Sequence, residues 1–319
     1  MIVTAKEANR LDKTLQLALD KPRNQIERLI KDVGVMIEGK KTHKSGFKLK
    51  GGERIEIHFH EAAPSTPQEI DFDIDIIYED EDLLILNKPP FLVVHPAPSV
   101  KEPTLVDWLK HRGISLSTIS GEERHGIVHR IDKETSGALV VAKNNETHQA
   151  LSAQLEDRTM GRYYLALIDL PLKEDTLIDK PIARDQNNRI KMSVTQRGRP
   201  SKSAFCKLLQ SDAPTSVELI AAKLFSGRTH QIRVHLQSLS RHILGDTLYG
   251  FKSKKDTIPR VMLHARVIYF EHPRTGKRII KEAPLFKDFE DVLSKYFKQE
   301  NIHEKINIDS LLRTFTHLT

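Results

Sequence analysis

The stretch with the most reactive side chains is residues 129–143, HRIDKETSGALVVAK. Its second half, 137–142, is a short apolar run rich in β-branched residues, which predicts a buried strand. The first half is then a loop at the end of that strand, where rigid scaffolds commonly carry catalytic groups. The charged side chains of this loop are Arg130, Asp132, Lys133 and Glu134.

Asp132 has two interpretations at this point. It can be a surface turn residue paired with Arg130 or Lys133, which is the more frequent case for this local spacing. It can also be a reacting carboxylate. The rest of the chain has to decide between the two.

A second stretch with many polar and charged side chains is residues 224–236, LFSGRTHQIRVHL. Apolar residues at helical spacing predict a helix over 231–240. Polar side chains and free backbone amides over 227–231 would then stand at a helix start, which is typical of an anion or phosphate site. His230 and His235 are five residues apart, which is poor spacing for a metal on a helix, so we expect no metal here.

Composition describes a globular protein of 319 residues with 39% hydrophobic and 29% charged residues. This length favours two domains. No apolar stretch approaches the roughly 18 residues of a membrane span, and the first residues lack signal-peptide features, so we expect a cytoplasmic protein. The single cysteine, Cys206, excludes an internal disulfide and is expected as a core residue of a strand over 204–208.

Charge is unevenly distributed. Residues 1–60 carry a net +5, residues 61–90 a net −8 and residues 91–319 a net +10, for a total of +7. Two basic blocks around an acidic one favour a polyanionic partner such as RNA.

The first basic block is expected to form helices from about 8 to 19 and from 23 to 33, then strands over 35–37 and 54–58 with a Gly-Lys-Lys turn at 39–41. Two helices beside lysine-rich loops suit phosphate binding, although a solvated helix face is the plainer alternative. The block resembles an S4 RNA-binding domain in residues 10–12, 23–26, 29–30, 34–35, 39–40 and 51–53, with Glu38 where that family usually has Asn. The resemblance implies RNA contacts from Arg10, Arg23, Arg28, Lys31, Lys40 and Lys41.

We expect four segments: an S4-like domain over 1–60, an acidic, proline-containing linker over 61–76, a catalytic domain over 77–297 and a polar tail over 298–319. In the catalytic domain we predict strands over 76–80, 82–86, 92–96, 158–170 and 261–270. Helices are predicted over 104–109, 148–155 and 286–297, with Trp108 as a packing residue. Residues 171–203 are expected to be irregular apart from 189–194.

Several long motifs in one order resemble the RluA-type family of RNA pseudouridine synthases, and the S4-like block resembles its subgroup that acts on large-subunit ribosomal RNA. The motifs are HRIDKETSG at 129–137, GRTHQIRVH at 227–235, GDTLYG at 245–250, NKP at 87–89 and LHA at 263–265. Phe91 departs from the family's usual Gly, and Arg162 replaces the usual Lys. The fold implied is α+β, with a mixed, mainly antiparallel sheet flanked by helices.

The resemblance implies three catalytic residues: Asp132, Tyr164 and, paired with Asp132, Arg233. It also implies substrate contacts from Arg228, His230 and Gln231, with Arg130 or His129 as a wedge in the gap left by an extruded base. Isomerising uridine breaks a C1′–N1 bond and joins C1′ to C5, which needs no cofactor or metal. Whether Asp132 attacks C1′, stabilises charge there or takes the 2′ proton stays open.

Two other classes remain as alternatives. One is a catalytically inactive RNA-binding or ribosome-assembly factor of the same fold, which would be expected to lack one of the three catalytic side chains. The other is a metal-dependent nuclease or hydrolase, which needs a carboxylate or histidine cluster that the spacing does not show. We expect a monomeric enzyme without cofactor, acting on large-subunit ribosomal RNA.

Overall fold

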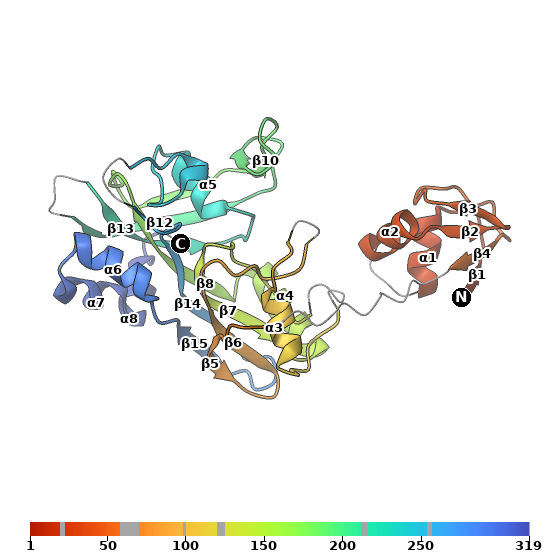
Figure 1. Cartoon of the computed structure of the whole chain (residues 1–319), viewed down its shortest axis with the longest axis horizontal. Helices are drawn as coiled ribbons and strands as arrows, with labels where there is room; N and C mark the ends of the chain where they lie inside the picture. Colours follow the sequence, from red (N-terminus) through yellow and green to blue (C-terminus); the bar gives the residue numbers. More distant parts are fainter. Residues whose placement is uncertain are drawn as a thin grey trace. The chain divides into compact units, whose positions relative to one another are not determined.

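The computed structural model describes residues 1–19, 23–57, 70–97, 100–119, 125–211, 216–253 and 257–318 (Figure 1). The chain divides into two compact units, Met1–Gln68 and Glu69–Thr319. Residues 61–69 of the expected linker lie outside the described residues. No helix in the described ranges combines the length and the apolar character that crossing a membrane requires.

The first unit contains two helices and a four-stranded antiparallel sheet of strand order β1-β4-β2-β3. Its apolar residues at helical spacing meet the inner face of the sheet, with Leu11, Leu15, Ile26, Ile30 and Ile55 fully buried. Both predicted helices are confirmed, whereas β1 was not predicted and residues 40–41 belong to a strand instead of a turn. The elements are β1 (Ile2–Thr4), α1 (Leu11–Leu19), α2 (Arg23–Asp32), β2 (Val35–Ile37), β3 (Lys40–Thr42) and β4 (Arg54–Ile57).

The β2–β3 turn explains why Asn is the usual residue where this chain has Glu38. Glu38 and Gly39 both have positive φ angles, 47° and 76°, as a two-residue hairpin loop requires. Asn tolerates this conformation better than Glu does. The Glu38 carboxylate compensates locally because it accepts a hydrogen bond of 2.5 Å from the Arg54 backbone N–H.

The second unit is built on a nine-stranded sheet of order β5-β6-β7-β14-β8-β13-β12-β9, with β15 also paired to β14 (Figure 1). Every pairing is antiparallel except β7 with β14, so the prediction of a mixed, mainly antiparallel sheet is confirmed. The strands are β5 (Asp75–Glu79), β6 (Leu83–Lys88), β7 (Ser136–Ala142), β8 (Gly161–Ile168), β9 (Thr176–Asp179), β12 (Lys202–Gln210), β13 (Glu218–Leu224), β14 (Leu263–Glu271) and β15 (Arg278–Glu282).

Helices cover both faces of this sheet. Alternate side chains along β6 and β7 point to opposite faces of the sheet. Those on one face pack with α4, and those on the other belong to the larger core with α3 and the C-terminal helices. Trp108 is buried in that core, and Cys206 is buried in β12, as predicted. The helices are α3 (Leu105–His111), α4 (Asn145–Asp157), α5 (Gln231–Gln237), α6 (Lys287–Tyr296), α7 (Gln299–Ile306) and α8 (Ile308–Thr314).

Two local predictions were wrong. Residues 92–96 form turns and loop, since the chain leaves β6 through two prolines and Phe91, which has a positive φ of 66°. Residues 171–203 are more ordered than expected, with β9 and a hairpin of β10 (Ile182–Arg184) and β11 (Met192–Val194). Strands of three or four residues pair through backbone groups and leave little hydrophobic pattern to detect.

The segments expected as linker and tail both contribute to the second unit. Ile74 is buried, and the Trp108 indole N–H donates to Asp73 at 3.2 Å, so residues 70–76 belong to this unit. The expected polar tail forms α7 and α8 and buries four apolar side chains in the main core. They are Ile302, Ile306, Leu311 and Phe315.

Candidate active site

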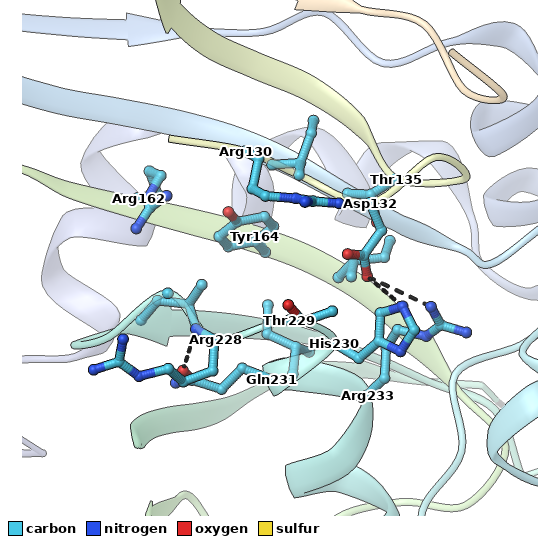
Figure 2. Close-up of a pocket in the computed structure, with 15 residues that line it drawn as sticks. Arg130, Asp132, Thr135, Arg162, Tyr164, Arg228, Thr229, His230, Gln231 and Arg233 are labelled. Carbon is cyan, nitrogen blue, oxygen red and sulfur yellow. Dashed lines mark hydrogen bonds and ion pairs between the residues drawn. The ribbon is translucent and has the colours of Figure 1, made fainter. Parts of the chain in front are cut away.

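A cavity in the second unit gathers side chains from three distant parts of the sequence (Figure 2). The loop before β7 provides Arg130 and Asp132, strand β8 provides Arg162 and Tyr164, and the residues from the end of β13 to the first turn of α5 provide most of the others. Figure 2 shows Asp132 and Arg162 at opposite ends of the cavity, with Tyr164 between them. The residues from 224–233 that line it include Arg228, Thr229, His230, Gln231 and Arg233.

The sheet register places Tyr164 beside the loop that carries Asp132. Gly137, Ala265, Tyr164 and Ala222 form one row across β7, β14, β8 and β13. Gly137 has a φ of +111°, and a Cβ there would lie 2.3 Å from the carbonyl oxygen of Ala265. Only glycine therefore permits this close approach of β7 to β14.

Two buried cationic side chains bind the backbone of the Asp132 loop. The Lys88 ammonium at the end of β6 donates to the carbonyl of Lys133 at 3.2 Å. The Arg260 guanidinium donates to the carbonyl of Glu134 at 3.2 Å and forms a two-point pair with Asp288 at 2.6 and 3.0 Å. Both side chains are at most 2% exposed. The two central residues of the loop's tight turn are thus anchored to the core through their carbonyls.

Lys88 is held as an ammonium by its surroundings. Burial and the charge of Arg260 lower the pKa of Lys88, and the charge of Asp132 raises it. The net pKa is about 7. Its Nζ also donates to the carbonyls of Pro89 and Leu92, at 2.6 and 3.0 Å. Three carbonyl acceptors satisfy three N–H groups, whereas a neutral amine would turn a lone pair toward one of them. The geometry therefore favours the charged form at neutral pH.

Arg233 lies between two carboxylates. Its Nη1 is 3.5 Å from Asp132 Oδ2, a long contact. Its Nε and Nη2 donate to the two oxygens of buried Asp246 at 2.7 and 2.8 Å. Burial lowers the pKa of Arg233, but the hydrogen bond and charge of Asp246, with the charge of Asp132, raise it above its ordinary value. The predicted pairing with Asp132 is present, and Asp246 is the closer partner.

His230 is oriented by Tyr249. His230 starts α5 in the left-handed conformation, with a φ of 56°. The Tyr249 hydroxyl accepts from the Met192 backbone N–H at 2.8 Å and lies 2.8 Å from His230 Nδ1. The hydroxyl proton is then available to Nδ1, which puts the imidazole proton on Nε2, 3.9 Å from Asp132 Oδ2. Burial lowers the pKa of His230, against the opposing charge of Asp132, so the ring is neutral at pH 7.

Tyr164 is 3% exposed and faces the cavity from β8. Burial raises the pKa of Tyr164, the charge of Arg162 lowers it, and the charge of Asp132 raises it again, with a net rise. Its hydroxyl is therefore a neutral phenol at physiological pH, with a flat ring available to pack against a base.

Seven of the eight predicted catalytic and substrate residues line this cavity. The exception is His129, whose buried ring accepts a hydrogen bond from the Val140 backbone N–H at 3.2 Å. Burial, with the nearby charge of Arg162, lowers the pKa of His129 well below its usual value. The buried ring of His129 supports β7, whereas Arg130 is exposed, so Arg130 is the more accessible of the two residues expected as a wedge.

Gln231 shapes the loop more than it faces the cavity. Its Oε1 accepts from the Ser226 hydroxyl at 2.8 Å and from the Arg228 backbone N–H at 3.0 Å. Its Nε2 donates to the Lys202 carbonyl and the Ser203 hydroxyl. The amide thus closes the 226–230 turn onto β12.

Sequence reasoning gave no role to several side chains that build this site. They are Lys88, Arg162, Asp246, Tyr249 and Arg260. Lys88, Asp246 and Tyr249 stand in recognised motifs, whereas Arg162 and Arg260 do not. The contacts that reveal the roles of these residues join positions 13 to 126 residues apart.

In the first unit the predicted RNA-contacting residues differ in availability. Lys31, Lys40 and Lys41 are exposed. Arg10 instead forms a two-point pair with buried Asp12, at 3.0 and 2.7 Å, which anchors the start of α1. The side chains of Arg23 and Arg28 lie outside the described residues.

Two groups of potential metal ligands are present in the described part of the chain, and neither lines the cavity. One is Asp80, Asp82 and His272, and the other is Asp175, Cys206 and His317. In the first group, Tyr78 donates to Asp80 and Arg274 pairs with Asp82, as expected of an ion-pair cluster that ties strand ends together.

Comparisons with known proteins agree with this geometry. A family model described as RNA pseudouridylate synthase matches residues 82–238. An uncharacterized RNA pseudouridine synthase of Helicobacter pylori strain J99 is 47% identical over 315 residues, covering 96% of this chain and 95% of that protein. The ribosomal large subunit pseudouridine synthase D of Zymomonas mobilis is 36% identical, covering 88% of this chain and 92% of that protein.

Among solved structures, human RNA pseudouridylate synthase domain containing 1 superposes with a TM-score of 0.53 at 23% identity. The superposition covers 73% of this chain and 96% of the human chain. This likeness supports the fold of the second unit.

Proposed function

The chain belongs to the RNA pseudouridylate synthase family, a family of isomerases, and from that premise we propose that it converts uridines of large-subunit ribosomal RNA to pseudouridine, with Asp132 as the reacting carboxylate and without a cofactor. The observation that carries the proposal is the meeting of Asp132, Arg233 and Tyr164 in one cavity.

Asp132 suits a reaction at C1′ of a ribose. Its side chain is 18% exposed, so a substrate can reach it, and Arg233 holds positive charge 3.5 Å away. An opposite charge at this distance attracts and orients the Asp132 carboxylate. An ionised carboxylate can attack C1′ or stabilise positive charge there while the C1′–N1 bond breaks, as in glycoside hydrolysis. The detached uracil then turns over and bonds through C5, so the net change is an isomerisation.

Tyr164 and His230 complete the proposed site. The Tyr164 ring can pack against the uracil, and its neutral hydroxyl can assist removal of the C5 proton in the last step. His230 presents a neutral Nε2–H beside Asp132, where it can donate a hydrogen bond to the carboxylate or the base. The base reaches this site only when extruded from its stack, and exposed Arg130 is placed to occupy the gap.

The target assignment rests on two relatives, at 36% and 34% identity, named ribosomal large subunit pseudouridine synthase D. We assign the first unit as an S4-like RNA-binding module, supported by its two helices, its small antiparallel sheet and the exposed lysines Lys31, Lys40 and Lys41. Such a module would give salt-sensitive affinity for structured RNA. We propose a monomer that acts in the cytoplasm.

The test is tritium release from a large-subunit ribosomal RNA transcript labelled with 5-³H-uridine, in the presence of EDTA, for the wild type and Asp132→Asn. Release by the wild type alone supports a metal-independent synthase that uses Asp132. Release by both proteins refutes the role of Asp132. Salt-sensitive binding without release by the wild type would favour the RNA-binding or assembly factor.

A further inference from the structure

A second and wider cavity, of about 700 Å³, adjoins the cavity around Asp132. The two share Arg130, Arg162, Leu224, Gly227 and Arg228 in their walls. The wider one continues between the C-terminal half of α4, with Arg158 after it, and the paired ends of β12 and β13. None of the catalytic roles proposed above uses the residues of its far wall.

Arg162 stands between the two cavities as a buried cation without a counter-ion. It is 6% exposed, and in the described part of the chain its Nε has no hydrogen-bond partner and its guanidinium forms no ion pair. A Cβ added to Gly227 would lie 3.5 Å from Arg162 Nη2, so the guanidinium reaches to the Gly227 turn. A buried charge is costly unless it is paired, so an anion bound beside Arg162 would relieve this cost.

The side chains that line the wider cavity carry mainly positive charge, as Arg162 does. Five cationic side chains line it against two acidic ones. Arg228, on the same side of the catalytic cavity as Arg162 in Figure 2, donates through Nε to the Pro200 carbonyl at 3.3 Å, which leaves its terminal nitrogens available. The cations are Arg130, Arg158, Arg162, Lys202 and Arg228, and the acids are Glu156 and Asp179.

An aromatic ring stands among these cations. Phe225 lines the wider cavity and is half-buried. The ammonium groups of Lys202 and Lys223 lie 5.0 and 5.1 Å from its ring centroid. An aromatic face beside positive charges is the arrangement on which single-stranded nucleic acids stack their bases while their phosphates are neutralised.

We propose that the wider cavity is a subsite for single-stranded RNA next to the target uridine, in which Arg162 and Arg228 bind a backbone phosphate and Phe225 stacks a neighbouring base. This proposal deepens the proposed function and rests on it, since the catalytic cavity must hold an extruded nucleotide of the same strand. One strand then passes from the base-sized cavity into the wider one, and Arg162 gains its missing counter-ion.

Binding of a fluorescein-labelled five-nucleotide oligouridylate to the full chain tests the subsite by fluorescence anisotropy across a salt series. Arg162→Gln is compared with Lys110→Gln, which removes an equal charge from an exposed position on α3 outside both cavities. Each lost contact with a single-strand phosphate decreases the magnitude of the negative slope of log K against log salt by about 0.7. We expect that decrease for Arg162→Gln and an unchanged slope for Lys110→Gln.

Two further readouts separate the subsite from a structural role. Arg162→Met should have a melting temperature equal to or above that of the wild type, because it removes an unpaired buried charge. Phe225→Ala should weaken oligouridylate binding about tenfold without changing the salt slope, as expected for a lost stacking contact. A large drop in melting temperature for Arg162→Met with an unchanged salt slope for Arg162→Gln would overturn the proposal.

The binding readout does not depend on turnover, so the two proposals fail in different ways. Tritium release by the wild type together with identical salt slopes for the wild type and Arg162→Gln would refute the subsite and leave the enzyme assignment intact. A reduced slope for Arg162→Gln without any tritium release would support the RNA subsite and refute the enzyme assignment.

Discussion

Arg233 binds Asp246 more closely than it binds Asp132. Two hydrogen bonds of 2.7 and 2.8 Å join Arg233 to Asp246, whereas its contact with Asp132 is 3.5 Å. Asp246 also accepts from the backbone N–H of Tyr249, at the 3₁₀ turn Thr247–Tyr249 that follows it. The cation beside the proposed nucleophile is therefore oriented by a second, buried carboxylate, and only Nη1 is left to face Asp132.

Asp246→Asn should reduce both activity and stability. The substitution leaves buried Arg233 with only the longer contact to Asp132 as charge compensation, so we expect a loss of about 3 kcal/mol in the free energy of unfolding. Arg233 would then move toward Asp132, and we expect kcat to fall at least tenfold. Urea unfolding and tritium release measure the two effects. Asp169→Asn is the control because it breaks a pair with His242 outside the cavity, and should lower stability alone.

Tyr249→Phe should change the pH dependence of the reaction. Without the hydroxyl, His230 Nδ1 loses the donor that stabilises the neutral imidazole, so the pKa of His230 should rise toward its ordinary value. Protonation of His230 beside Asp132 would then occur at higher pH. The acid limb of the profile of kcat/KM against pH should therefore shift to higher pH. Tyr78→Phe, which removes a hydroxyl bonded to Asp80, should leave the profile unchanged.

Lys88→Met should loosen the Asp132 loop. The substitution keeps an unbranched apolar side chain, one atom shorter, but leaves the carbonyls of Pro89, Leu92 and Lys133 without their donor. We expect kcat to fall at least tenfold with KM changed by less than about threefold, together with a loss of about 1–3 kcal/mol in unfolding free energy. Lys143→Met is the matched control, since Lys143 binds Glu79 and the Asp80 carbonyl at the other end of β7. Equal losses of kcat in both variants would argue against a role for Lys88 in positioning the loop.

Phe91→Gly should stabilise the protein. Phe91 is 52% exposed and has a φ of 66°, a left-handed conformation that costs a non-glycine residue roughly 1–2 kcal/mol. The greater flexibility of glycine in the unfolded chain offsets about half of the gain, so we expect an increase of up to about 1 kcal/mol in unfolding free energy. Leu170→Gly, at an exposed position without a positive φ, should instead destabilise.

Acid should destabilise the protein partly through His264. Its Nε2–H donates to the Ala283 carbonyl at 3.2 Å and its Nδ1 accepts from the Ser136 hydroxyl at 2.9 Å. Burial lowers the pKa of His264 to about 3. Between pH 3 and 6.5 the unfolded chain therefore binds a proton that the folded chain does not, and stability falls as the pH falls through this window. His264→Gln should reduce the slope of unfolding free energy against pH there by about 1.4 kcal/mol per pH unit. An unchanged slope would mean that His264 is already charged in the folded protein.

The sequence by itself was enough for the family, the mainly antiparallel sheet and three side chains of the cavity. The resemblance carried by the motifs implied these features, and local patterns predicted the loop of charges before β7 and the polar helix start before α5. Asp132 and Arg233 could be named because each stands inside a contiguous motif, and Tyr164 was named from the resemblance alone.

Only the tertiary structure decided how those side chains are held. Asp246 lies 13 residues from Arg233, and Lys88 lies 45 residues from the carbonyl that it binds, so neither contact has a sequence period. His129 and Arg130 are neighbours in one motif, yet the ring of one is buried against β7 and the side chain of the other is exposed. The polar C-terminal segment packs into the core through four apolar side chains among charged ones. Whether these four side chains are buried depends on the surface against which the C-terminal helices pack, and the packing of the whole second unit determines that surface.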